Sequence, residues 1–430
     1  MGPTILLDKS ALQALSAQEL EFLYRYYNLN IAPVLVVEIL GDLMKPDKEG
    51  NLTGKDVTQL ANKLLQLNSA VNGHYRMLLI NSLIGHRIRM EGRPIVLIDR
   101  LVESDGKRGT ITSESVEEKA IHRWREGDFS EAEKILSQRW RESTRQHDPT
   151  TIADILKKFS VLLSNAKNFD QLVKIADLLF LPENVQSVIL ELTIDFFQIS
   201  QTLASQIFYR WEQRQYSSVK EFAPYAFHCF RATLLYYLGV SRNYLTTRPT
   251  NNVDLEYVYY LPFTNIFVSR DKFHKTLVPP LLQPDQTFVD GDELKADLKV
   301  TAQEWSQLEE SQRAGWLEKY GEYPPEREGS ITATLWQKYL TLANTTIHEA
   351  SARARTHQKR EGKSNIIEEI RRAQEEGKTI VPTSDDDLDD ANIDFIQRER
   401  MISINDPCPC GSGKKFKDCH LDQYTKSQKK

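Results

Sequence analysis

The chain has 430 residues, of which 40% are hydrophobic and 27% charged, and its formal net charge is −5. This length suits two or three globular domains of about 100–200 residues, and the slightly acidic balance argues against a strongly basic nucleic-acid-binding protein. The first residues contain neither the basic stretch nor the apolar run of a signal peptide, so we expect a cytoplasmic protein. Apolar stretches stay below the roughly 18 residues that span a bilayer, so we expect no membrane span.

The N-terminal region predicts strands and helices in alternation. Residues 5–8, Ile-Leu-Leu-Asp, are typical of a short buried strand. Ser16 with Glu19 three positions later predicts a capping box for a helix over residues 17–27. A further helix, opened by a proline, is expected over residues 33–43. Residues 93–99 are expected to form another strand, so this region predicts an α/β domain.

The middle of the chain has helical periodicity, and the α/β pattern then returns. A short helix is expected over residues 253–263 and a buried strand over residues 265–269, with further helices over 301–319 and 332–378. Residues 384–390 form an acidic linker. The expected parts are a parallel-sheet α/β domain in two pieces (1–112 and 246–285), a helical insertion (113–245), a helical and charged linker region (286–400) and a small C-terminal module (401–425).

Acidic residues stand at the ends of these apolar elements. Asp8 ends the first strand, Glu38 lies in an apolar helix, Asp254 begins the later helix and Asp271 follows the last strand. If the first and last strands are neighbours in a parallel sheet, Asp8 and Asp271 share one cleft at its carboxyl edge. Clustered carboxylates repel unless a cation compensates, and all-oxygen ligands suit Mg²⁺ or Mn²⁺. Taken singly, an Asp at a strand end or helix start is more often a cap or loop residue, whereas Glu38 lies among apolar residues and needs a partner.

The same residues resemble the motifs of PIN-like domains. Ile5-Leu-Leu-Asp8 is similar to their first strand, the helix with Glu38 is similar to the one that supplies their second acid, and Asp254 followed by Ser269-Arg-Asp271 is similar to their ending. The resemblance implies that these four acids hold one or two Mg²⁺ or Mn²⁺ ions and act catalytically, and that Ser269 orients Asp271 or a water. PIN domains are mostly endoribonucleases. Residues 39–253 separate the second acid from the third, far more than a compact PIN domain uses, so we expect an insertion there. Asp42 and Asp99 are reserve candidates.

Basic and aromatic residues lie close in sequence to the last two acids. Our candidates for binding the substrate are Ser269, Arg270 and Lys272, and the two cations would contact its backbone, because phosphate contacts supply most sequence-independent affinity. Three tyrosines nearby could stack on a single strand or belong to the core: Tyr257, Tyr259 and Tyr260.

Three of the four cysteines fall near the C-terminus, in the pattern Cys408-Pro-Cys410 followed by Cys419-His420. Three thiolates and one imidazole supply the four ligands of a tetrahedral structural zinc, whose binding would provide the folding energy of so short a segment, roughly 10–16 kcal/mol. The spacing resembles the SEC-C motif, a zinc module that also ends the translocase motor SecA and looks there like a docking element.

The sequence therefore predicts a metal-dependent PIN-like nuclease. An endoribonuclease is our first interpretation, in RNA turnover or in a toxin or antiphage role, with a terminal zinc module that docks on RNA, the ribosome or a protein. Two alternatives stay open: a non-catalytic adaptor that binds the translation or secretion machinery through the zinc module, and a DNA nuclease.

Overall fold

A five-stranded parallel sheet, in the order β3-β2-β1-β6-β7, organises the α/β part of the chain. The computed structural model describes residues 2–65, 68–96, 100–104, 107–112, 114–146, 148–150, 152–154, 166–320, 323–339 and 379–382. The strands of the sheet are β1 (Thr4–Leu7), β2 (Asn28–Ile31), β3 (Ser69–Val71), β6 (Ile266–Ser269) and β7 (Thr287–Asp290). The predicted parallel α/β class is confirmed.

The central strand β1 pairs in parallel with β2 on one side and β6 on the other. Ile5, Leu6 and Leu7 are fully buried, as expected for a parallel strand covered by helices on both faces. β2 carries a buried polar residue, Asn30, whose side chain donates to the Phe263 carbonyl at 2.9 Å. This polar position explains why the apolar pattern of the sequence did not predict β2.

Helices from residues 9–84 and 251–320 surround this sheet. The predicted capping box of Ser16 and Glu19 is present at the start of α2. The helical elements are α1 (Lys9–Ala14), α2 (Ala17–Tyr26), α3 (Pro33–Gly41), η1 (Asp42–Met44), α4 (Lys55–Ala61), α5 (Tyr75–Ile84), α14 (Asn251–Val258), η4 (Leu261–Phe263), α15 (Lys272–Leu277), η5 (Pro279–Leu281), α16 (Gly291–Gln307) and α17 (Glu310–Tyr320).

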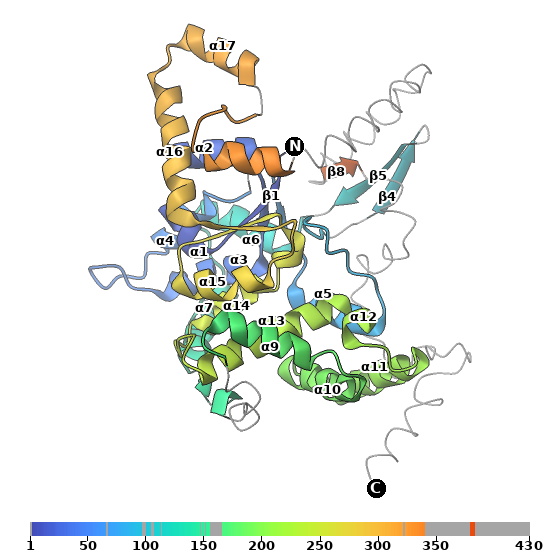
Figure 1. Cartoon of the computed structure of the whole chain (residues 1–430). Coiled ribbons are helices and arrows are strands. Elements are labelled where there is room, and N and C mark those ends of the chain that lie inside the picture. Colours follow the sequence, from blue (N-terminus) through green and yellow to red (C-terminus); the bar gives the residue numbers. More distant parts are fainter. Residues whose placement is uncertain are drawn as a thin grey trace.

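The segment between the two pieces of the sheet is helical where the structure describes it. In Figure 1 the green helices α9 to α13 gather below the sheet, whereas α16 and α17 stand above it. The elements are α6 (Val116–Arg125), α7 (Glu131–Gln146), α9 (Phe169–Leu179), η3 (Glu183–Val185), α10 (Gln186–Phe196), α11 (Gln201–Gln213), α12 (Val219–Phe222) and α13 (Pro224–Ser241). α13, which is buried along most of its length, packs on α5, and α7 packs on α3, so both ends of the segment contact the sheet domain.

A smaller antiparallel sheet stands apart from the first. It contains β4 (Arg100–Ser104), β5 (Lys107–Thr112) and β8 (Thr379–Pro382), with β5 in the middle. None of the described helices combines the length and the apolar character of a bilayer-crossing segment.

Several predicted boundaries differ from the structure. Residues 93–96 form no strand, and the nearest strand starts at residue 100. The single helix expected over 301–319 is two, because α16 starts at Gly291 and ends at Gln307. The main sheet also continues to β7, beyond residue 285, the expected end of its second piece.

Other expectations fall partly or wholly outside the described residues. Of the helix expected over 332–378, residues 332–339 are helical and the rest lies outside. The acidic linker, Asp99 and the C-terminal cysteine cluster lie outside as well.

Candidate active site

A cleft of about 290 Å³ lies at the carboxyl edge of the parallel sheet. Asp8 directly follows β1 and Asp271 begins the helix after β6, and these strands are parallel neighbours, so both acids reach the same edge. Glu38 from α3 and Asp254 from α14 line the same cleft. The structure thus brings together the four acids that the sequence had placed far apart. The full lining is Asp8, Lys9, Ser10, Gln13, Glu38, Asp42, Lys45, Trp140, Thr250, Val253, Asp254 and Asp271.

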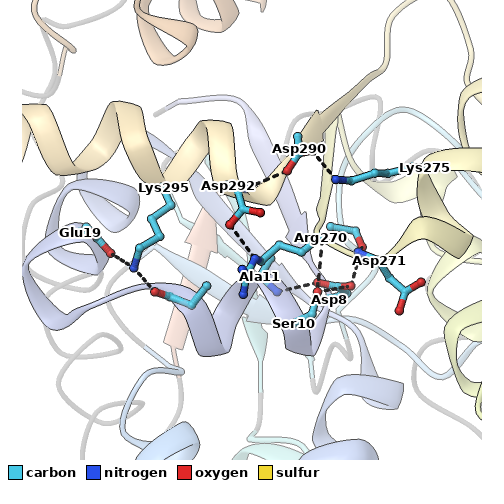
Figure 2. A network of polar contacts seen from close by, with 12 residues as sticks. Asp8, Ser10, Ala11, Glu19, Arg270, Asp271, Lys275, Asp290, Asp292 and Lys295 are labelled. Carbon is cyan, nitrogen blue, oxygen red and sulfur yellow. Dashed lines mark hydrogen bonds and ion pairs between the residues drawn. The ribbon is translucent and has the colours of Figure 1, made fainter.

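The Asp8 carboxylate is buried and held by several donors. Its Oδ1 accepts the Ala11 N–H at 2.8 Å, which caps α1, and the Ser10 hydroxyl lies 2.9 Å from both carboxylate oxygens (Figure 2). Ser269 donates its hydroxyl to Oδ2 at 2.6 Å. Burial raises the pKa of Asp8, but the contacts with His274, Ser269 and Ala11 outweigh it and hold that pKa below its ordinary value. Asp8 is therefore ionised at neutral pH.

His274 provides a buried positive charge behind Asp8. Its Nδ1 lies 3.4 Å from Asp8 Oδ2 and 2.8 Å from the Ser269 hydroxyl, while its Nε2 lies 2.8 Å from the Asp254 carbonyl. Burial lowers the pKa of His274, but the hydrogen bonding and the negative charges of Asp8 and Asp254 raise it to about 9. The imidazolium therefore links the ends of β1 and β6 to the first turn of α14 in one network.

Ser269 orients a different acid from the one that the resemblance implied. Its hydroxyl bonds to Asp8, and it accepts the backbone N–H of Asp271 at 3.0 Å instead of touching the Asp271 carboxylate. Asp271 itself caps α15, with Oδ1 accepting the Phe273 N–H at 2.7 Å. Ser269 therefore fixes the turn that carries Asp271 while its side chain positions Asp8.

A lysine ammonium lies among the acids on the α3 side. Lys9 Nζ is 2.7 Å from Asp42 Oδ2, 3.1 Å from the Glu38 carbonyl and 3.9 Å from Glu38 Oε1. The other Glu38 oxygen accepts the Tyr257 hydroxyl at 2.7 Å. Burial raises the pKa of Glu38 even though Lys9 and Tyr257 act in the opposite direction. Asp42, a reserve candidate, is thus brought into the cleft as the ion-pair partner of Lys9.

Asp254 carries the least compensated charge of the cleft. Its carboxylate has no hydrogen bond or ion pair with another described residue, since His274 contacts only its backbone carbonyl. Burial raises the pKa of Asp254 to about 7; the positive charge of His274 acts against this rise, and the negative charges of Glu38 and Asp271 add to it. A cation would relieve this repulsion.

The chemistry of this donor set fits a hard divalent ion, because the groups are carboxylates with raised proton affinity at two positions. Their arrangement, however, falls short of a complete ligand set for a metal ion. Across the described residues, no group of three or more His, Cys, Asp or Glu side chains stands ready as a ligand set. Lys9 accounts for part of this, because it occupies the space between Glu38 and Asp42.

The predicted substrate-binding cations lie away from the cleft. Arg270 Nε binds Asp292 Oδ1 at 2.8 Å, and Figure 2 shows its guanidinium turned toward α16. Lys272 is exposed, and neither side chain lines the cleft. Lys9 and Lys45 are the lysines that do. The three tyrosines considered for stacking are buried core residues: Tyr257, Tyr259 and Tyr260.

Sequence reasoning missed the roles of Lys9, His274 and Trp140. Lys9 follows Asp8 directly, which was a usable signal, because the residue after a strand end shares its edge of the sheet. His274 lies among the basic residues that follow Asp271, and its position in the sequence does not distinguish it from Lys272 and Lys275. Trp140 lies in α7, far from any acid in sequence, and no local pattern connects it with the cleft.

Comparison with known proteins finds a family motif at the end of the chain. Residues 405–422 match the family model described as SEC-C motif. The chain ends in a SEC-C motif. The "Protein translocase subunit SecA" of Legionella pneumophila (strain Lens) is 42% identical over 60 residues, which cover 13% of this chain and 7% of that protein. The SecA subunit of Porphyromonas gingivalis (strain ATCC BAA-308 / W83) is 72% identical over 25 residues, 6% of this chain and 2% of its own.

These matches cover small parts of both partners. The chain covers 7% or less of the length of these SecA proteins. No solved structure matches the chain at a significant level. The SEC-C residues, with Cys408, Cys410, Cys419 and His420, lie outside the described part of the structure, so their ligand geometry is not part of the site above.

Proposed function

We propose that the chain is a metal-dependent phosphodiesterase of the PIN-like class, acting as an endoribonuclease in the cytoplasm. The observation that carries the proposal is the convergence of Asp8, Glu38, Asp254 and Asp271 in one cleft. They come from two strand ends and two helices that are distant in sequence. Neighbouring acids destabilise a fold unless a cation or a proton compensates, so their convergence favours a cation-dependent role.

All four acids are metal ligands in this proposal, and Asp8 and Asp254 differ in their protonation. Asp8 stays ionised because Ser269 and His274 stabilise its negative charge. Asp254, with a pKa of about 7, can accept and release a proton near neutral pH. Glu38 and Asp271 complete the oxygen donors, and all four would hold Mg²⁺ or Mn²⁺. A bound divalent ion would supply Lewis acidity toward a phosphodiester and toward the attacking water.

The test is hydrolysis of labelled single-stranded and structured RNA by the purified full chain with Mn²⁺ or Mg²⁺. Asp8→Asn and Asp271→Asn are each expected to lower the rate by at least roughly a hundredfold, as for loss of a charge-stabilising group. Asp290→Asn is the matched control, because Asp290 ends the adjacent strand β7 but lies outside the cleft. Cleavage that persists in both cleft variants would overturn the proposed site.

A DNA nuclease is distinguished by running labelled DNA substrates in the same assay. The adaptor alternative is favoured by one observation, namely that the acids are not arranged as a ready ligand set. It predicts that neither RNA nor DNA is cut with either metal. The four carboxylates in one cleft support the nuclease over the adaptor, which has no need for them.

For the C-terminus we propose a structural Zn²⁺ held by Cys408, Cys410, Cys419 and His420, the soft and borderline donors that zinc prefers. The SEC-C match supports this ligand set. The module would dock the nuclease on a partner, either a protein, the ribosome or RNA. Such recruitment is compatible with RNA turnover and with a toxin or antiphage role.

A further inference from the structure

The helical segment supplies one wall of the acidic cleft. Trp140, on α7, lines the cleft together with Gln13 and Lys45, although α7 belongs to neither piece of the parallel sheet. Its indole is half-buried. An aromatic ring therefore borders the same cavity as the four acids.

The position of this ring is held by contacts around Gly41, at the end of α3. Ser137 and Arg141 both donate to the Gly41 carbonyl, at 3.3 and 3.2 Å, and the Met44 N–H donates to Ser137 Oγ at 3.3 Å. The indole lies directly on Gly41, because a Cβ added there would come within 2.3 Å of Trp140 Cζ3. The ring therefore rests on the backbone at Gly41, and its helix is anchored there by Ser137, one turn before Trp140, and by Arg141, the residue after it.

The groups at this wall have unused binding capacity. The Trp140 indole N–H has no hydrogen-bond partner, and its ring stacks on no other aromatic side chain, within the part of the chain that the structure describes. Lys45 is half exposed, and its ion pair with Asp56 is long, at 3.9 Å. A flat aromatic surface beside a lysine matches an unpaired base and its phosphate.

We propose that Trp140 and Lys45 form a subsite for one unpaired nucleotide of a single-stranded RNA, beside the acids that act on the phosphodiester. Trp140 stacks on the base and Lys45 contacts a phosphate. This inference rests on the proposed function and specifies its substrate as single-stranded. A duplex does not fit the subsite, because its bases are already stacked and cannot lie on the indole.

The experiment measures binding of a short fluorescein-labelled oligouridylate to the full chain by fluorescence anisotropy, with Ca²⁺ replacing Mg²⁺. Trp140→Leu keeps an apolar side chain on Gly41 but removes the aromatic face, and it is expected to weaken binding roughly 5- to 100-fold. Trp140→Phe keeps a ring and is expected to weaken binding no more than about fivefold. An RNA duplex of the same length is expected to bind the wild-type chain at least roughly tenfold more weakly.

A second measurement does not depend on the stability of the leucine variant. A base stacked on Trp140 quenches its fluorescence, so adding the oligouridylate should lower the tryptophan emission of the wild-type chain more than that of Trp140→Phe. Equal quenching in both proteins, or equal affinity of Trp140→Leu and wild type, would overturn the subsite.

The outcomes separate the subsite from the nuclease itself. Cleavage by wild type that is unchanged in Trp140→Leu overturns the subsite and leaves the nuclease standing. If RNA binding depends on Trp140 but the wild-type chain cleaves no RNA, the subsite is supported and the proposed nuclease activity is overturned. A wild-type chain that neither binds nor cuts oligonucleotides overturns both.

Discussion

Asp8 and His274 form a buried ion pair, with Nδ1 and Oδ2 3.4 Å apart, that joins the end of β1 to the helix after β6. The pair holds the pKa of Asp8 low and raises that of His274 to about 9. His274 does not itself line the cleft, so it acts on the site by positioning Asp8 and the Asp254 carbonyl. Its charge offsets one of the acids before any metal binds.

His274→Gln is expected to lower the free energy of unfolding of the metal-free protein by roughly 3 kcal/mol, because it leaves Asp8 as an unpaired buried charge. The pKa of His274 is raised above its ordinary value of 6.5, so its stabilisation is fully present below pH 6.5 and is lost as the pH rises through about 9. Urea unfolding with a chelator, over this pH range, measures the difference between variant and wild type.

The control for this variant is His122→Gln, because His122 is largely exposed on α6. It should leave the pH dependence of unfolding unchanged. The free energy of unfolding of wild type can be compared with that of His274→Gln from pH 6.5 to about 9. If their difference stays constant over this range, the imidazole is not charged in the folded protein.

Lys9→Met is expected to increase the affinity of the cleft for Mn²⁺, by roughly tenfold, because the ammonium that now compensates Glu38 and Asp42 competes with a divalent ion. Electron paramagnetic resonance of free Mn²⁺ measures the affinity and the number of bound ions. Lys272→Met serves as the control, since Lys272 is exposed and outside the cleft. Weaker Mn²⁺ binding in Lys9→Met would instead mean that Lys9 organises the acids for the metal.

Gly41→Ala is expected to destabilise the chain by about 1–3 kcal/mol, because its methyl group would overlap the Trp140 ring and push α7 away from α3. Gly315→Ala, on α17, is the matched substitution, since a Cβ there meets open space, and it should be neutral or slightly stabilising. Urea denaturation midpoints compare the two. Equal stability of both variants would show that α7 is not held tightly on Gly41.

Cys408→Ser is expected to release the proposed Zn²⁺ without changing the melting transition of the α/β part. Cys229→Ser gives the opposite pattern: it keeps the zinc and lowers stability by about 1–3 kcal/mol, because it places a hydroxyl at a fully buried position on α13. Elemental analysis and thermal melting measure the two effects. A lowered melting temperature in Cys408→Ser would indicate that the zinc module packs on the core.

Elements with strong local signals could be predicted before the structure. β1 and β6 are apolar runs, α2 begins with a capping box and α3 with a proline, and each appears where its signal lies. β2 and β3 were missed, because short strands that contain Asn or Ser are stabilised by their parallel partners more than by their own residues. The strand expected over residues 93–99 is absent at residues 93–96, where Ile95 accepts the Gly73 N–H just beyond β3 but its own N–H donates to the Asn72 side chain, so no strand ladder forms.

The sequence by itself determined the positions of the acids and the spacing of the C-terminal cysteines, because a strand end or a chelating pair is encoded by adjacent residues. Only the tertiary structure decided which groups share the cleft. In the folded chain Arg270 forms an ion pair with Asp292, and the Ser269 hydroxyl donates to Asp8. Lys9 lies between Glu38 and Asp42. Trp140, from the helical segment, lines the cavity wall. These pairings depend on strand order and helix packing, which bring together residues that no local pattern relates.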